Sequence, residues 1–424
     1  MIICAANRKI KMRKFLYKIF PVKEYDFKSF CFPLLLIVYV LGFIGVYLIY
    51  VLDYYEKQAI KQNLYTKQIL AFGIGIGLIL FVALVDYHII AKLAPLIYLF
   101  GIGLLLICKF VDNPPIYGWK HYTARRWIKI GGDPSLGINN PGFEFQPSEV
   151  VKIALVVFLA WFFFKTHKHI KKLWVLAIAI VFTALPILII FDQPDLSTSV
   201  LLFAVFSAMV LISGVAYKYI ITIIAVVVPS AVFLLWYIQQ DFQTIFTDYQ
   251  VDRVKSLLYP EDYPELAYQQ QNAVAAIKQG GLTGKVLQGV EANLASRSVP
   301  VRESDFIFAS VCEEFGFIGA VLILLGYAFM ILMIIRIARK SKDYLGRMMA
   351  VGFGAMLLVQ VSINIGVVTY ILPNTGIALP FMSSGLSSLL VNLLMIGILL
   401  NISLQPRGKA KVREESPLGY IDLK

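Results

Sequence analysis

Hydrophobic residues along this chain fall into runs of about twenty, the helix length needed to cross a hydrocarbon core roughly 30 Å thick. Ten such runs are predicted to span a membrane, near residues 31–52, 67–85, 89–110, 149–164, 173–191, 196–214, 217–239, 306–335, 345–371 and 379–404. The predicted fold class is therefore an all-α polytopic membrane protein. Its transmembrane domain covers residues 31–404, between a basic tail at 1–30 and a second tail at 405–424.

Two long polar segments interrupt this pattern, at residues 111–148 and 240–305. The second lies between the seventh and eighth predicted helices and is punctuated by proline and glycine, which favour turns over low-complexity chain. Within it, residues 268–281 (YQQQNAVAAIKQGG) predict a short helix that ends at glycine. Because loops commonly carry function, we expect the protein to work at the face where both segments lie.

The distribution of basic residues predicts the orientation. Placing the N-terminus in the cytoplasm leaves roughly 24 Lys and Arg inside and roughly 14 outside, as the positive-inside rule requires. The basic segments at 165–172 and 336–347 and both tails are then cytoplasmic. The two long polar loops face outward.

Composition supports the membrane assignment and excludes a water-soluble globular protein. Hydrophobic residues make up 59% of the chain and charged residues only 15%. The net charge of +13 would suggest a nucleic-acid partner in a soluble chain, but here topology and contact with membrane lipids explain it. The four cysteines, Cys4, Cys31, Cys108 and Cys312, show neither zinc-site spacing nor an obvious disulfide pairing.

Ionisable residues at or just inside the predicted helix ends are the candidate functional groups, because charges at membrane depth are costly. They are Glu149, Lys152, Asp192, Asp195, Asp305, Glu313 and Glu314. Glu149 and Lys152 are three residues apart, which permits an ion pair on one helix face, and a purely structural pair is the alternative. Arg125, Arg126 and Trp127 precede them in the same outer loop.

Cations beside carboxylates at the membrane surface suit the binding of a lipid diphosphate and the activation of a hydroxyl group. Both a sugar-transferring enzyme and a lipid-headgroup transporter would use such a composition. The sequence shows no internal repeat of the kind common in secondary transporters, which favours the enzyme.

Six motifs carry a resemblance to a known family. They are ARRWIKIGG, FEFQPSEVVKIAL, FDQPDLSTS, QQQNAVAAIKQGGLTGK, SDFIFASVCEEFGFIG and LPNTGIALPFMSSGLSS, in this order from residue 124 to the last helix. In these motifs the chain resembles the shape, elongation, division and sporulation family, whose members include RodA, FtsW and SpoVE. The ten predicted spans, with a long outer loop between helices seven and eight, agree with that family.

The resemblance implies a peptidoglycan glycosyltransferase that polymerises lipid II at the outer face of the bacterial cytoplasmic membrane. It also implies a class B penicillin-binding protein as partner, which supplies the cross-linking transpeptidase. A lipid II flippase is the alternative function, and a non-catalytic scaffold for the partner is a third. A role in elongation, division or sporulation is left open.

By the same resemblance, Asp305 matches the family's essential aspartate, Trp127 its tryptophan, Glu149 and Lys152 its QPSE-x-x-K pair, and Asp195 the aspartate of QPDL. We expect Asp305 to take the proton of the acceptor hydroxyl, and Arg126, Lys152 and Arg253 to neutralise the leaving diphosphate. A cap on the eighth helix is the alternative role of Asp305, and interfacial anchoring that of Trp127. A magnesium or manganese ion is compatible with this chemistry, although no ligand cluster demands one.

The chain departs from the family pattern at three places. Glu303 and Ser304 replace a His-Thr pair, residues 383–388 read SSGLSS instead of SYGGSS, and Ser197 replaces a glycine. None of these changes removes a charged group from the expected site.

Overall fold

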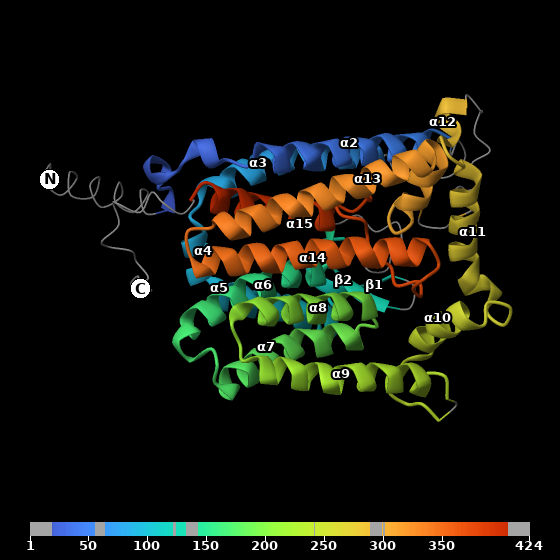
Figure 1. Cartoon of the computed structure of the whole chain (residues 1–424). Coiled ribbons are helices and arrows are strands. Elements are labelled where there is room, and N and C mark those ends of the chain that lie inside the picture. Colours follow the sequence, from blue (N-terminus) through green and yellow to red (C-terminus); the bar gives the residue numbers. More distant parts are fainter. Residues whose placement is uncertain are drawn as a thin grey trace, which may run out of the picture.

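The computed structural model describes residues 19–55, 64–121, 124–132, 143–240, 242–288, 299 and 302–405. Long helices lie side by side in a bundle (Figure 1). They are α2 (Phe32–Tyr55), α3 (Leu64–Leu84), α5 (Ala94–Phe110), α6 (Pro147–Lys165), α7 (Leu173–Asp192), α8 (Leu196–Ser213), α9 (Tyr217–Tyr237), α13 (Ile307–Lys340), α14 (Tyr344–Val368) and α15 (Leu386–Ser403). Within the described residues, eight of these helices, all except α5 and α9, are long and apolar enough to cross a membrane.

Each of the ten predicted spans overlaps one of these helices, and the largest differences at the helix starts are at the third and the last span. The span predicted at 89–110 is divided at Leu93 into α4 (Tyr87–Lys92) and α5. Pro95 lies in the first turn of α5, where its missing N–H group is tolerated, so the chain restarts a helix there. The last helix begins at Leu386 rather than 379, because residues 380–384, which start at Pro380, form turns and bends before Gly385.

Helix α6 forms the centre of the bundle. Almost every residue from Pro147 to Phe163 is buried, because α6 packs against α5, α8 and α14. A helix that is apolar all round is expected to be surrounded by other elements. The polar pair Glu149 and Lys152 therefore enters the interior with the first turn of α6.

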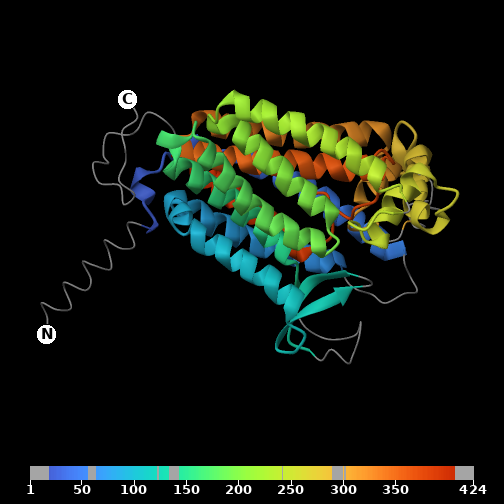
Figure 2. The ribbon, with the colours of Figure 1, turned by 90° about the horizontal axis from the view of Figure 1, so that it is seen from below.

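One end of the bundle, called the loop end below, carries the folded parts of both long polar segments. The first forms an antiparallel sheet in the order β1-β2-β3, from β1 (Ile116–His121), β2 (Ala124–Ile130) and β3 (Phe143–Phe145). Figure 2 shows this sheet projecting from the bundle. The second forms α10 (Asp248–Leu258), α11 (Pro264–Gly280) and α12 (Gly284–Gln288). Helix α11 confirms the predicted short helix ending at glycine.

Helix α13 bends at Gly316, whose φ of 65° lies in the left-handed region that favours glycine. The stretch before the bend receives α11 and α12. A Cβ atom on Gly280 would lie 1.9 Å from the carbonyl oxygen of Cys312, and one on Gly284 would lie 2.2 Å from that of Glu314. Glycine at these positions lets the two backbones touch. Lys285 then reaches the fully buried Glu313, with its Nζ 2.5 Å from Oε1.

At the opposite end, the first and last described segments meet. The Asp26 N–H donates to the carbonyl oxygen of Leu404 at 2.9 Å. Nearby, His88 lies between Asp86 and Asp343, with ring nitrogens 2.6 and 2.7 Å from their carboxylate oxygens. Desolvation alone would lower the pKa of His88, but its hydrogen bonds to Asp343 and Asp86 outweigh burial and raise the pKa to about 9. The segment at residues 86–88 is thus joined through one imidazolium to Asp343, which precedes α14.

Candidate functional site

Asp305 lies at the loop end, immediately before α13. The N-cap of α13 is Phe306, and no side chain makes a capping hydrogen bond there, so the carboxylate is not used as a helix cap. The Ser304 hydroxyl donates to Asp305 Oδ1 at 2.8 Å. The Asn364 amide, from α14, donates to the backbone oxygens of Asp305 at 2.8 Å and Ile377 at 2.7 Å. Asn364 therefore ties residues 369–385, the connection between α14 and α15, to the segment that carries Asp305.

The surroundings of Asp305 combine poor solvation with nearby charge. Burial raises the pKa of its carboxyl group above the ordinary value, whereas the Ser304 hydrogen bond and the positive charges of Arg253 and Arg126 lower it, and the negative charge of Asp195 raises it. The net direction is upward. Asp305, Arg126, Arg253 and Asp195, which are far apart in sequence, thus form one electrostatic cluster.

Arg126 reaches this cluster from β2. Its Nε donates to the carbonyl oxygen of Gln193 at 3.0 Å, and its Nη2 donates to that of Pro194. These two oxygens belong to the turn between α7 and α8. The contacts hold the sheet against that turn and place the guanidinium near Asp305.

Asp195 has a clear local role as the N-cap of α8. Its carboxylate accepts hydrogen bonds from the Thr198 N–H at 3.2 Å and the Thr198 hydroxyl at 2.9 Å. Ser197 lies with its Oγ 3.2 Å from Asp195 Oδ1, and its hydroxyl donates to the carbonyl oxygen of Thr375 at 2.8 Å. Ser197 therefore links α8 to the α14–α15 connection.

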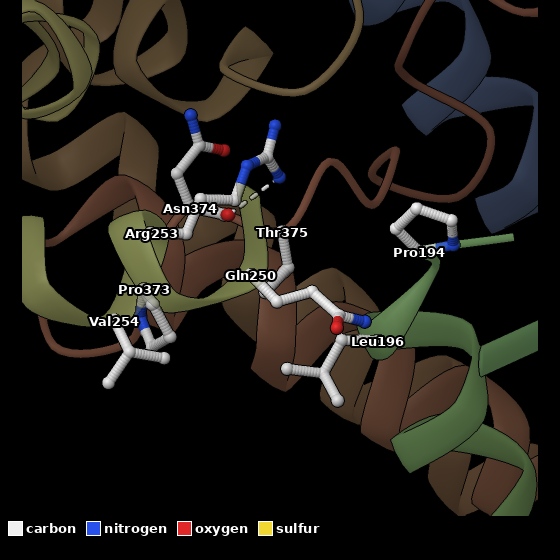
Figure 3. A pocket seen from close by; sticks show the side chains of 8 residues that line it. All are labelled: Pro194, Leu196, Gln250, Arg253, Val254, Pro373, Asn374 and Thr375. Carbon is white, nitrogen blue, oxygen red and sulfur yellow. Dashed lines mark hydrogen bonds between the residues drawn. The ribbon is translucent and has the colours of Figure 1, made fainter. Parts of the chain in front are cut away.

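Arg253 comes from α10, and its Nη1 donates to the carbonyl oxygen of Asn374 at 2.7 Å. A pocket opens beside this contact (Figure 3), lined by Pro194, Leu196, Gln250, Arg253, Val254, Pro373, Asn374 and Thr375. Three segments meet here: the start of α8, α10 and the α14–α15 connection. The position next to Thr375 faces the carboxylate, because a Cβ atom on Gly376 would lie 3.2 Å from Asp305 Oδ2.

The predicted Glu149–Lys152 ion pair is confirmed. Lys152 Nζ lies 2.8 Å from Glu149 Oε1, and both side chains are buried. The second carboxylate oxygen, Glu149 Oε2, has no hydrogen-bond partner within the part of the chain that is described. The charges that act on Asp305 come from Arg253, Arg126 and Asp195. A diphosphate contact for Lys152 therefore stays a prediction.

Trp127 is partly buried in β2 and pairs with Trp119 of β1 across the sheet. Its backbone oxygen lies 3.5 Å from the Cys108 sulfur at the end of α5. This contact anchors the strand on the bundle, and sugar stacking by the indole stays a prediction. As for a metal ion, the described residues contain no cluster of three or more His, Cys, Asp and Glu side chains that could hold one.

Comparisons with known proteins bear on the assignment. The sequence profile of the FtsW, RodA and SpoVE family, described as cell cycle protein, matches residues 30–408. This chain belongs to that family. Stage V sporulation protein E of Bacillus subtilis (strain 168) is 35% identical over 344 residues, which cover 80% of this chain and 86% of the relative. The peptidoglycan glycosyltransferase MrdB of Escherichia coli (strain K12) is 33% identical over 340 residues, covering 79% and 84%.

The fold of the family is confirmed by a solved structure. One chain of a peptidoglycan synthase complex, studied for its coordination of polymerization and crosslinking, has a TM-score of 0.67 and 24% identity with this chain. The match covers 89% of this chain and 97% of the other. The protein is a multi-pass helical membrane protein of this family.

Sequence reasoning missed several residues of the site. Asn364 positions the backbone of Asp305, and Gln250 and Thr375 line the adjacent pocket. All three are uncharged, so a search for ionisable residues at the predicted helix ends could not select them. Thr375 lies within the LPNTGIALP motif, which was a signal for importance without indicating a role.

Proposed function

We propose that this protein is a peptidoglycan glycosyltransferase that polymerises lipid II at the outer face of the bacterial cytoplasmic membrane. The observation that carries the proposal is the Asp305 carboxylate, poorly solvated and flanked by Arg126 and Arg253 beside a pocket. Family membership and the name of MrdB support the reaction. The loop end then faces outward and both termini are cytoplasmic, in agreement with the charge distribution.

The reaction needs one base and one set of cations. Asp305 takes the proton of the acceptor sugar's 4-hydroxyl as that oxygen attacks the anomeric carbon of the lipid-linked donor. The new glycosidic bond forms with inversion while the bond to undecaprenyl diphosphate breaks. A raised pKa strengthens the carboxylate as a base, and general base catalysis contributes about 10²- to 10⁴-fold.

Arg126 and Arg253 supply the positive charge for the departing diphosphate. Each donates hydrogen bonds to backbone oxygens, which help to hold the guanidinium in place before the substrate arrives. Preorganised cations stabilise developing charge without reorganising during the reaction. Lys152 is a third candidate, buried in α6.

A class B penicillin-binding protein is the proposed partner. The support is the structural similarity to a chain of a complex that couples polymerization to crosslinking. The partner's transpeptidase would cross-link the strands that this protein forms.

Substitution of Asp305 by Asn tests the catalytic assignment. Asn keeps the shape of the side chain but cannot take the proton, so polymerisation of purified lipid II in detergent should fall by about two orders of magnitude or more. The melting temperature should not change, because the carboxylate caps no helix. Asp192→Asn is the control. Asp192 ends α7, its side chain is 57% exposed, and its carboxylate pairs with Lys109 of α5.

The same assay separates the enzyme from the transporter and from the scaffold. Detergent offers no second compartment, so glycan strands formed there require catalysis. An Asp305→Asn protein that is well folded and polymerises at the parental rate would contradict the assignment. Absence of product from the parental protein, with its partner and a divalent salt present, would contradict the proposed function itself.

A further inference from the structure

The pocket beside Asp305 contains two buried polar atoms that nothing in the described chain satisfies. Gln250 Nε2 and Thr375 Oγ1 are both inaccessible to solvent and have no hydrogen-bond partner among the described residues. Gln250 as a whole is only 3% exposed. Buried polar groups are normally hydrogen-bonded, so an orphaned pair lining one pocket indicates that a ligand completes them.

The orientation of the Gln250 amide is fixed by its own helix. Gln250 and Thr247 form the capping box of α10, in which Gln250 Oε1 accepts the Thr247 N–H at 3.1 Å. Turning the amide over would place its NH₂ group against that N–H and break the cap. Its NH₂ group is therefore a committed donor. Figure 3 shows the amide end of Gln250 extending toward Leu196.

The rest of the pocket wall is apolar or cationic except for Asn374, whose side-chain amide donates to Gln269 Oε1 at 2.6 Å. Leu196, Val254, Pro194 and Pro373 supply the apolar surface, and Arg253 supplies the charge. An amide donor, a hydroxyl and an apolar wall together match an acetamido group. Its carbonyl oxygen would accept from Gln250 Nε2, its N–H would donate to Thr375 Oγ1, and its methyl group would pack on the apolar wall.

We propose that this pocket binds the 2-acetamido group of the donor sugar, the sugar that carries the diphosphate. The inference rests on the proposed function and names the part of the substrate that the site recognises. In such a sugar the acetamido group and the diphosphate are on neighbouring carbons, so a ligand that places phosphate near Arg253 presents the acetamido group to the same wall. The anomeric carbon carries the diphosphate, and Gly376, next to Thr375 of this pocket, faces the carboxylate of Asp305.

The test compares two substrates and two variants. The first substrate is lipid II, and the second is a lipid II analogue in which a hydroxyl group replaces the acetamido group of the diphosphate-linked sugar only. Thr375→Val removes the orphan hydroxyl and keeps the side chain's shape, while the backbone oxygen bound by Ser197 remains. Gln250→Glu keeps an oxygen for the Thr247 cap and removes the NH₂ donor.

With the parental protein, kcat/KM for the analogue should be about tenfold or more below that for lipid II, because the analogue leaves the buried polar atoms of the pocket without partners. Thr375→Val should lower kcat/KM for lipid II by about tenfold and leave the value for the analogue nearly unchanged. Gln250→Glu also adds a negative charge beside Arg253, so it should lower kcat/KM for both substrates, but for lipid II by about tenfold more than for the analogue. Thr222→Val, at an exposed hydroxyl on α9, is the control and should behave as the parental protein. If Thr375 had only a structural role, the parental protein would not discriminate between lipid II and the analogue through it, and Thr375→Val would change the two kcat/KM values equally. Such a role also has no contact to act through, because Thr375 Oγ1 makes no hydrogen bond within the described chain.

Two results would overturn the inference. One is equal use of lipid II and the analogue by the parental protein, and the other is a loss in the variants that is the same for both substrates. Failure of the proposed function looks different, since the parental protein would then polymerise neither substrate. The melting temperature of each variant is measured as well. A folding defect lowers the melting temperature and lowers kcat/KM for lipid II and for the analogue together, and that result counts against the inference.

Discussion

At the scale of single residues, Asp305 is held in a balance between lost solvation, which raises its pKa, and two arginines, which lower it. The reaction needs the deprotonated carboxylate. We therefore expect the polymerisation rate to fall at acid pH, with a midpoint above the ordinary pKa of an aspartate. Initial rates across a pH series measure this midpoint.

Substitution of Arg253 by Gln tests whether the positive charge of Arg253 lowers the pKa of Asp305. Loss of a positive charge leaves burial less opposed, so the pKa of Asp305 should rise and the acid limb of the profile should move to higher pH. The plateau rate should also fall if Arg253 contacts the diphosphate. A limb that stays in place or moves to lower pH would show that another group is the base.

Variants of Lys152 and Glu149 can separate the contribution of this ion pair to stability from its contribution to polymerisation. Removing one partner of a buried ion pair typically costs about 3–5 kcal/mol, so Lys152→Ala should lower the melting temperature strongly and reduce polymerisation. A double change, Glu149→Leu with Lys152→Met, replaces the pair by apolar side chains and should restore stability. We expect polymerisation to stay low in the double variant, because the diphosphate contact is missing. Recovery of both properties would leave the pair a structural role only.

The sequence predicted this pair and the set of charged candidates, but it could not assemble the site. Spacing along one helix is sufficient to bring Glu149 and Lys152 together. Asn364 and Asp305 are 59 residues apart, and their contact depends on how α13 and α14 pack. The orphaned atoms of Gln250 and Thr375 appear only when burial is known.

At the scale of elements, glycines set how closely the α11–α12 segment approaches α13. Gly280→Ala would place a methyl group 1.9 Å from the Cys312 carbonyl oxygen, so we expect lower thermal stability and weaker polymerisation as α13 is displaced near Asp305. Gly77→Ala in α3 is the matched control, because open space surrounds that position. It should be neutral or stabilising, by up to about 1 kcal/mol. Equal melting temperatures for the two variants would contradict the close packing.

The long helices were predictable from the sequence because the thickness of the membrane sets their length. The break in a helix and the strands outside the bundle were harder to predict. Apolar runs located all ten segments, whereas the break at Leu93 depends on a proline at the start of α5. The sheet β1-β2-β3 was not predicted from the sequence. Its strands are short, and β2 pairs with β3, which is separated from it by a connecting segment. Its place on the bundle depends on tertiary contacts such as that between Arg126 and the α7–α8 turn.

At the scale of the whole molecule, the proposed orientation can be measured with single cysteines introduced after replacement of the native ones. Leu282→Cys, at a residue 64% exposed at the loop end, should react with a membrane-impermeant maleimide added outside intact cells. Lys168→Cys, in the basic connection after α6, should react only after the membrane is opened, because positive loops stay inside. Labelling of Lys168→Cys from outside would invert the orientation and move the site to the cytoplasm.

The contact between the first and last described segments has a topological consequence. Asp26 and Leu404 are joined by a backbone hydrogen bond, and Tyr25 and Asn401 by a side-chain bond of 3.0 Å. The described path of the chain therefore starts and finishes at neighbouring positions of the bundle. The contact between residues 25–26 and residues 401–404 does not depend on a covalent connection, so deleting either segment would remove both hydrogen bonds.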